Sequence, residues 1–508
     1  MKLKIFIIFI YSTLLLFFTF KLDPENMFVS DTFIKLIQAN SIIENNFLSE
    51  VIHCKNLSVF NHCQFLTPGS FFISDKLLGP FPIFQTFLMA AIIKLSFPEM
   101  IQWVSTFLFI ISLTYLYIKW NLHPILVSFM ILCTPAFIHS ISFFGYAISF
   151  FFLAFGLSFL FTQEKNFMKN VYAFLLGLPI FFRPEFILIS GPILFFYTLY
   201  NSNKLKLVST SIFFLLPVFS FLTINYLLYN NILGTRIISN KSGIFNTTSL
   251  IERWNIIQSL LFYGNMRVGL FMYTPIFLLI LVIPPFIFFR KDIKLPDNSL
   301  KILFFSIITS LISISLFSPN DSNIDWGSRY VSGLILLFIL YIKKLYDLQF
   351  PLNKKFAFII VILLSLYSVT ISKKYLNMNI TLSQKNKEIK TFYLSTHSPV
   401  WIFTSDKLLH PSGLEFLKRP ILYIKKEEDI NSLITLLKQN KYKQITFFQL
   451  NSLFSSFSIN NNKTLSFSSP ELEKKIVETF TKEFSIPKKS FQTLINAYTF
   501  SLEKVISK

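Results

Sequence analysis

One acidic segment of the sequence contains residues suited to proton transfer. Residues 21–79 contain six carboxylates and four lysines. Asp31 begins a stretch in which Phe33, Leu36, Ile37 and Asn40 fall at helical spacing, which predicts an interfacial helix with a carboxylate at its N-terminal end. An ordinary helix N-cap without a chemical role is the alternative interpretation of Asp31. The six carboxylates are Asp23, Glu25, Asp31, Glu44, Glu50 and Asp75.

Two basic segments further along the chain could bind an anion. Residues 230–270 carry four basic residues against the single acidic Glu252, and the string NDSNIDWGSRY at residues 320–330 contains Arg329. A guanidinium group suits the phosphate of an anionic substrate, and aromatic side chains suit a lipid tail or a sugar ring. Anchoring at the edge of a bilayer is the alternative for each residue. The residues concerned are Arg236, Lys241, Arg253, Arg267, Asp321, Asp325 and Arg329, with Trp254, Phe262, Tyr263, Phe271, Tyr273 and Trp326.

The string HCKNLSVFNHC contains two His-Cys pairs, His53 with Cys54 and His62 with Cys63. Such pairs could ligate zinc, but ligand spacing alone is a weak signal. A disulfide between the two cysteines is favoured if this loop faces an oxidising compartment.

The composition indicates that these residues are positioned by membrane-spanning helices. The chain has 508 residues, of which 53% are hydrophobic and 14% charged, and its mean hydropathy is +0.56. Soluble domains are about 45–50% apolar and about 25% charged. The net charge of +21 does not indicate nucleic-acid binding, because many Lys and Arg residues lie in short loops between apolar segments, as the positive-inside rule describes.

Placing the basic loops inside the cell predicts eleven spans, a cytoplasmic N-terminus and an extracytoplasmic C-terminus. Residues 80–98 must then lie along the outer surface or dip into it, because a further span would invert every later loop. Arg183, Pro184 and Glu185 interrupt residues 177–200, which are therefore two short half-helices or one kinked span. The embedded charges must be paired or face a cavity, and pairing that holds two short helices is favoured. The predicted spans lie near 4–20, 100–118, 124–142, 147–162, 170–182, 184–200, 207–229, 271–289, 301–318, 330–346 and 355–372.

A small α/β domain is predicted over residues 373–508, where charged residues return at the density of a soluble protein. Residues 400–404, 420–424 and 444–450 are expected to be strands. Helices are expected over 428–439 and from Ser469 through Phe484. The predicted membrane domain is residues 1–372, with outer loops 21–99, 230–270 and 319–329.

The order of these features resembles the GT-C superfamily of membrane glycosyltransferases, which contains protein O-mannosyltransferases, oligosaccharyltransferase catalytic subunits and the aminoarabinose transferases of lipid A. The resemblance covers about residues 1–372: one N-terminal helix, then a long outer loop in which an early acid, Asp31, leads an amphipathic helix. The quoted strings, in order, are GPFPIFQTFLMAAIIKLSF, TPAF, GLPIFFRPEF, YGNMRVGLFMYTP and DWGSRY.

The resemblance implies an inverting transfer of a sugar from a polyprenyl-phosphate carrier to an envelope glycan, lipid or protein acceptor at the outer face of the cytoplasmic membrane. It implies that Asp31 is the general base, and that Arg267 and Arg329, and less directly Arg236 and Arg253, bind the donor phosphate. Accessory roles are expected for Asp75, Lys76, Tyr263 and Trp326.

The sequence departs from the family pattern at its acidic residues. Many members carry an acid-x-acid pair in the first loop and an acid in the second outer loop, but Thr32 and Phe33 follow Asp31, and the second loop, HSISFFGYA, has no acid. Asp23 and Glu25 form the only acid-x-acid pair of the first loop and are a weaker alternative site. These departures argue against a bound divalent metal. A transporter, flippase or polymerase of lipid-linked sugars, or a non-catalytic relative, is the alternative function.

Overall fold

The computed structural model describes residues 2–27, 31–52, 71–73, 76–142, 144–160, 166–200, 204–239, 250–264, 267–288, 298–318, 329–347, 354–440, 442–450, 456–460, 463–466, 469–492 and 495–502. It divides into two compact units. Unit 1 is Met1–Lys21 with Ile101–Asn379, and unit 2 is Leu22–Met100 with Ile380–Lys508. The predicted domain border at residue 372 therefore differs from the border between the units, and the first outer loop belongs to the same unit as the C-terminal domain.

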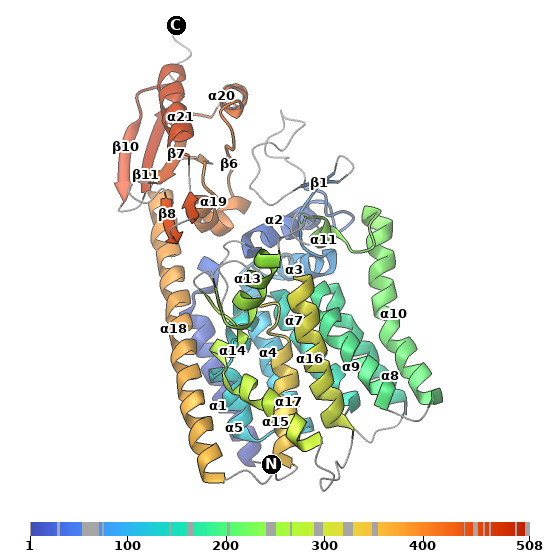
Figure 1. Ribbon diagram of the computed structural model, residues 1–508. Coiled ribbons are helices and arrows are strands. Elements are labelled where there is room, and N and C mark those ends of the chain that lie inside the picture. The colour runs from blue at the N-terminus through green and yellow to red at the C-terminus, as the bar shows by residue number, and fades with distance from the viewer. Residues whose placement is uncertain are drawn as a thin grey trace. The chain divides into compact units, whose positions relative to one another are not determined.

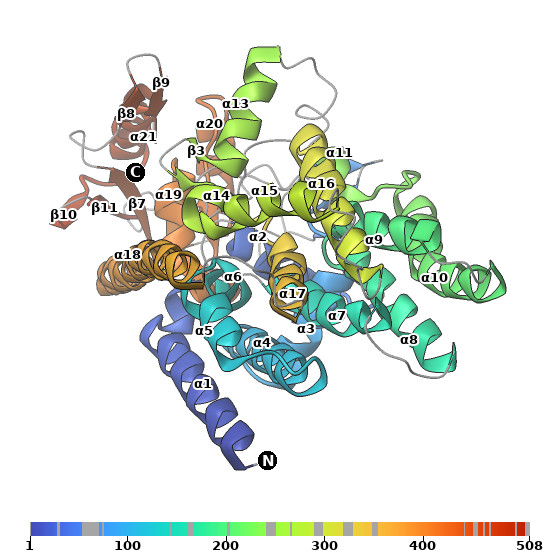
Figure 2. The ribbon, with the colours of Figure 1, turned by 60° about the horizontal axis from the view of Figure 1, so that its bottom comes forward.

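Unit 1 is a bundle of apolar helices that run side by side (Figures 1 and 2). Long runs of Ile, Leu and Phe without charge favour helices whose backbone groups are all satisfied internally. Its main helices are α1 Lys2–Lys21, α4 Met100–Lys119, α5 Pro124–Leu132, α6 Ala136–Ser142, α7 Phe144–Gly156, α8 Asn166–Gly177, α9 Ile187–Tyr200, α10 Lys204–Tyr229, α13 Leu250–Leu261, α15 Ile276–Phe288, α16 Ser299–Phe317, α17 Leu334–Asp347 and α18 Lys354–Ser395, of which the part beyond Asn379 belongs to unit 2.

The count of eleven spans is not supported. Among the described residues, five helices are long and apolar enough to cross a membrane, or six if the bent pair α5 and α6 is one span. Several predicted spans are instead helices of 10–17 residues, and residues 124–142 bend by 59° between α5 and α6. Two short helices, Phe167–Phe181 and Pro184–Tyr200, flank Arg183. The chain is nevertheless a helical, multi-pass membrane protein by the length and composition of these helices.

Close approach and polar contacts hold the bundle together. A Cβ on Gly177 would lie 2.5 Å from the Phe214 carbonyl oxygen, so only glycine lets α8 approach α10 this closely. Between α1 and α4, the hydroxyl oxygens of Thr19 and Thr106 are 2.8 Å apart. Small residues and interhelical hydrogen bonds are the usual means of helix association in lipid, where no hydrophobic driving force acts between helices.

The C-terminal part of unit 2 is a five-stranded mixed sheet of order β10-β11-β7-β5-β6, in which β5 pairs in parallel with β6 and β7. It confirms the three predicted strands and both predicted helices. The predicted helices appear as α20 Asp429–Gln439 and α21 Pro470–Glu483, the latter capped by the Ser469 hydroxyl. The strands are β5 Val400–Phe403, β6 Ile421–Tyr423, β7 Gln444–Leu450, β10 Lys488–Gln492 and β11 Ile495–Ser501, and a separate hairpin joins β8 Ser456–Asn460 to β9 Lys463–Ser466.

Both faces of this sheet are covered, and the first outer loop supplies part of one cover. Side chains alternate across β5, so Val400 and Ile402 pack with α20 and α21 while Trp401 and Phe403 point to the opposite face. That second face shares its core with Phe33 and Ile37 of α2 (Asp31–Glu44) and with the end of α18. Because they share one core, the first outer loop and the C-terminal domain must lie on the same side of the membrane.

Candidate functional site

Asp31 is the first residue of α2 and is partly exposed. Contacts of the buried side chains of α2 hold Asp31 in this position. Phe33 packs against the rings of His410 and Phe416, with centroid distances of 5.4 and 5.5 Å, in the short helical segment η6 (His410–Leu417). Gln38, fully buried, donates to the Phe81 carbonyl oxygen at 3.3 Å and accepts from the Phe81 backbone N–H at 3.2 Å.

The Gly-Pro-Phe-Pro segment is shaped by its contact with α2. A Cβ on Gly79 would lie 2.1 Å from the Gln38 side chain, so a larger residue there would displace Gln38 from its hydrogen bonds to Phe81. The ammonium of Lys35 lies 4.6 Å from the centre of the Phe81 ring. The string GPFPIFQTFLMAAIIKLSF therefore has a structural role within unit 2, because it packs on the helix that begins at Asp31.

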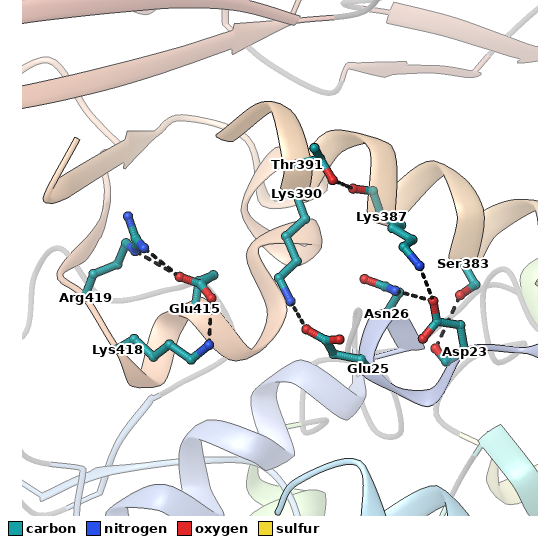
Figure 3. A network of polar contacts seen from close by, with 10 residues as sticks. All are labelled: Asp23, Glu25, Asn26, Ser383, Lys387, Lys390, Thr391, Glu415, Lys418 and Arg419. Carbon is teal, nitrogen blue, oxygen red and sulfur yellow. Dashed lines mark hydrogen bonds and ion pairs between the residues drawn. The ribbon is translucent and has the colours of Figure 1, made fainter. Parts of the chain in front are cut away.

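Polar contacts tie the chain just before Asp31 to α18 (Figure 3). Glu25, in the short helical segment η1 (Pro24–Met27), forms an ion pair with Lys390, and Asp23 pairs with Lys387 at 3.4 Å. The Asn386 side chain donates to the Asn26 carbonyl oxygen at 3.0 Å. Asp23 and Glu25, the alternative acid-x-acid pair, are therefore engaged by lysines of the same unit, which favours a structural role for them.

Unit 1 contains the four arginines predicted to bind phosphate. Arg267 lies in β4 (Arg267–Val268), which pairs with β3 (Tyr263–Gly264) as a short hairpin after α13. The Val268 backbone N–H donates to the Tyr375 hydroxyl oxygen of α18 at 2.9 Å. A Cβ on Gly269 would lie 2.5 Å from the Phe262 backbone nitrogen, so the glycine after the hairpin allows the chain to turn back closely.

The segment that follows the hairpin is also anchored. Tyr273 and Tyr375 stack with ring centroids 5.7 Å apart, and the hydroxyl oxygens of Tyr273 and Ser372 are 2.9 Å apart. Thr274 donates to the Cys133 carbonyl oxygen at 2.8 Å. In the string YGNMRVGLFMYTP, Val268, Tyr273 and Thr274 therefore anchor the chain that follows Arg267.

The predicted aromatic setting divides into two groups. Trp254, Phe262 and Tyr263 are exposed, at 64%, 39% and 60% of their surface, whereas Phe271 and Tyr273 are buried. Trp254 lies on α13, Tyr263 lies in β3 of the Arg267 hairpin, and Phe262 lies in the turn between these two elements. Of these five described aromatic residues, Trp254, Phe262 and Tyr263 can present a surface to a lipid tail or sugar ring.

Two of the four arginines have contacts that give them a structural task. Arg253 donates from Nη1 to the Ser318 carbonyl oxygen at 2.7 Å, at the end of α16, where helix carbonyls lack intrahelical donors. Arg236 interacts electrostatically with Glu185. Glu185 also accepts from Arg183 Nε at 2.8 Å, so the embedded charges pair with each other as expected.

Arg329 lies at the beginning of the segment that leads into α17. Its guanidinium carbon is 5.8 Å from the centre of the Tyr330 ring, and its carbonyl oxygen accepts from the Ser332 hydroxyl at 2.8 Å. Ser332 in turn offers its carbonyl oxygen to Tyr146, at 3.2 Å. The turn from Arg329 to Ser332, which begins at the end of the DWGSRY string, is thus tied to Tyr146 of α7 through Ser332.

The remaining predicted site residues divide between described and undescribed parts of the chain. Asp31 belongs to unit 2 and the four arginines to unit 1. Lys76 is exposed in β2 (Lys76–Leu78). Among the residues that the structure describes, no three His, Cys, Asp or Glu side chains form a group that could hold a metal ion. Asp75, Trp326, Cys54 and Cys63, with the disulfide expected between the last two, lie outside the described residues.

Lys387, Lys390 and Tyr375 were not found from the sequence. They lie on the part of α18 that continues beyond the predicted span, where the sequence offers only scattered charge. Comparisons with protein-family models and with curated proteins find no match to this chain. The fold defines the class, a helical membrane protein with a C-terminal mixed sheet that packs on α2 of its first long loop.

Proposed function

We propose that the protein is a membrane glycosyltransferase that moves a sugar from a polyprenyl-phosphate carrier to an acceptor at the extracytoplasmic face of the cytoplasmic membrane. The proposal takes the N-terminus as cytoplasmic and unit 2 as extracytoplasmic, following the positive-inside pattern. The observation that carries it is the hairpin of Arg267, which is anchored to Tyr375 and bears the exposed Tyr263, with the exposed Phe262 just before it and the exposed Trp254 on the preceding helix α13. An amphipathic donor with an anionic phosphate and a long hydrocarbon chain matches that combination.

In the proposed reaction, the acceptor hydroxyl oxygen attacks the anomeric carbon of the donor sugar from the face opposite the phosphate. The bond from this carbon to the phosphate oxygen breaks, and its electron pair leaves with the polyprenyl phosphate. Asp31 takes the hydroxyl proton, and the product has the inverted configuration. Arg267 and Arg329 bind the phosphate as its negative charge grows, which stabilises the transition state electrostatically.

The charge arrangement within each unit supports these roles. Asp31 begins a helix, where the N-terminal dipole favours the ionised carboxylate that a base must be. Arg253 donates to the Ser318 carbonyl oxygen and Arg236 interacts electrostatically with Glu185, and both contacts favour a structural role for these two arginines. The family resemblance assigns the phosphate first to Arg267 and Arg329. The packing of α2 against η6 supports a fixed position for Asp31, which a general base requires.

The direct test uses purified protein in proteoliposomes with a radiolabelled polyprenyl-phosphate sugar and a mixture of envelope glycans, lipids and peptides as acceptors. Label should move into one acceptor class, with polyprenyl phosphate released in equal amount. Translocation of intact donor across the vesicle without release of polyprenyl phosphate would instead establish the transporter function. Binding of donor with neither reaction would indicate a non-catalytic relative.

A further inference from the structure

Helix α3 (Ile83–Leu95) of unit 2 is amphipathic in the reverse sense to a helix of a soluble domain. Gln85, Thr86, Met89 and Ala90 form its buried face. Its outer face is apolar at helical spacing, with Phe87 exposed at 40%, Leu88 at 37% and Leu95 at 88%. A helix that buries a glutamine and a threonine while exposing phenylalanine and leucine is suited to hydrocarbon outside it.

A turn at the end of α2 extends this apolar surface. Phe47 packs edge-on against Phe87, with ring centroids 5.2 Å apart, and the next residue, Leu48, is 90% exposed. Asn46 and Phe47 both adopt left-handed backbone conformations, with φ of 52° and 63°. A bulky residue rarely adopts this conformation, and such strain persists where the surroundings impose it and is concentrated at functional positions.

The chain on both sides leads directly into membrane-spanning helices. Residues 22–100 begin where α1 ends at Lys21 and finish where α4 begins, and both helices are candidate spans. Only four residues separate α3 from α4, and one of them, Phe97, is 60% exposed. The C-terminal end of α3 is therefore held close to the level at which α4 enters the bilayer.

The length of α3 decides how it can meet the membrane. Its 13 residues extend about 20 Å, whereas the hydrocarbon core is about 30 Å thick. A helix this short cannot span the core, but it can lie in the interface with its apolar face among the acyl chains. Lys94, which is exposed near the end of α3, can keep its ammonium in the headgroup region while its stem lies along apolar surface.

We propose that the surface formed by Phe47, Leu48, Phe87, Leu88, Leu95 and Phe97 is a docking surface for the lipid bilayer. It is inserted into the outer leaflet and holds unit 2 on the membrane. This inference does not depend on the chemistry proposed above, because it rests only on which side chains face outward and where the chain enters the membrane. The sequence alone places residues 80–98 at the outer surface. The proposal adds which face of α3 meets lipid, and it includes the turn at the end of α2 in the same surface.

The test places a benzophenone amino acid at single positions of the full-length protein, reconstituted in nanodiscs of phosphatidylethanolamine and phosphatidylglycerol. Photolysis is followed by mass spectrometry of the adducts. Leu88 and Leu95 are the test positions. Phe9, 66% exposed on α1, is the positive control, and Phe491, 84% exposed on β10, is an equally apolar control in the same unit.

Lipid adducts are expected at Leu88 and Leu95 with yields comparable to that at Phe9, and none at Phe491. Crosslinked dimers from Leu88 or Leu95 would show that a second copy of the chain covers the surface and would overturn the proposal. It would equally be overturned by lipid adducts at Phe9 alone. Both outcomes can be read whether or not the preparation transfers sugar.

Discussion

Lys390 forms an ion pair with Glu25, a residue 365 positions earlier in the chain. The Lys390 side chain is 10% exposed and that of Glu25 46%. Together with the Lys387 pair, which Figure 3 also shows, it fastens the chain just before Asp31 to the C-terminal end of α18. The hydrogen bond from Asn386 to the Asn26 carbonyl oxygen adds to this attachment. The position of the proposed base is therefore set by residues that belong to the C-terminal half of unit 2.

Lys390→Ala should loosen η1 and the first turn of α2. Because Glu25 is about half exposed, the loss should be about 1 kcal/mol of local opening free energy, or about fivefold faster amide exchange there. Hydrogen–deuterium exchange with mass spectrometry measures this. Lys385→Ala is the matched control, since Lys385 pairs with Glu388 on the same helix, both exposed. Equal exchange of residues 22–44 in the two variants would show that the Lys390 pair does not fasten this segment.

Glu415 should make the stability of unit 2 depend on pH. Burial alone would raise its pKa, but hydrogen bonding and charge from Lys418, with Arg419, outweigh burial and hold the pKa below its ordinary value of 4.5. A carboxylate whose pKa is lower in the folded state than in the unfolded state stabilises the folded protein at pH values above the unfolded-state pKa. This contribution is lost as the pH falls through the folded-state pKa.

The thermal unfolding temperature of wild-type protein should therefore fall steeply as the pH is lowered below about 4.5. Glu415→Gln should be less stable than wild type at neutral pH and should show a shallower fall over the same range. The measurement is thermal unfolding in detergent, followed by circular dichroism of the sheet. A variant with the wild-type slope would mean that other carboxylates account for the acid sensitivity.

The parts predicted from the sequence are those with a local pattern. The alternation in β5 and β7 and the buried stripe of Ile430, Leu433, Ile434 and Leu437 in α20 need only neighbouring residues to be recognised. The long extent of α18 was not predicted, because beyond residue 372 its polar residues lie on nearly every side and no apolar stripe marks a helix.

Contacts between distant segments explain the other differences. The packing of Phe33 on η6 joins residues far apart in sequence, and no local period encodes it. Arg253 was predicted as a phosphate ligand because its charge has no neighbour of opposite sign in the loop other than Glu252. Its bond to the Ser318 carbonyl oxygen depends on where α16 ends, which becomes visible only in three dimensions.

Tyr375→Phe should weaken the hairpin that contains Arg267. It removes the acceptor of the Val268 N–H, and leaving a part-buried donor unsatisfied costs about 1–3 kcal/mol. Faster amide exchange in residues 263–275 and weaker donor binding should follow. Tyr367→Phe is the control on the same helix, because Tyr367 is 39% exposed. Unchanged exchange and binding in Tyr375→Phe would show that the hydroxyl does not hold the hairpin.

Cys54 and Cys63 should be joined by a disulfide, because the predicted topology places them outside the cytoplasm. Closing so short a loop contributes about 2–3 kcal/mol locally. Alkylation under denaturing conditions without reductant should label Cys133 alone, and reductant should expose the other two thiols. Labelling of all three without reductant, or stoichiometric zinc in the purified protein, would contradict the disulfide.

The kinetics of single substitutions in the proteoliposome transfer assay test the proposed mechanism most directly. Asp31→Asn keeps the shape of the side chain but cannot accept a proton, so turnover should fall by about 10²–10⁴ while donor affinity survives. Glu44→Gln, at the other end of α2, should behave as wild type. Arg267→Ala and Arg329→Ala should weaken donor binding as well as turnover, because the phosphate is charged in both the ground and the transition state. Near-normal turnover in Asp31→Asn would contradict the assignment of the base, and undiminished transfer in both arginine variants would contradict the proposed donor site.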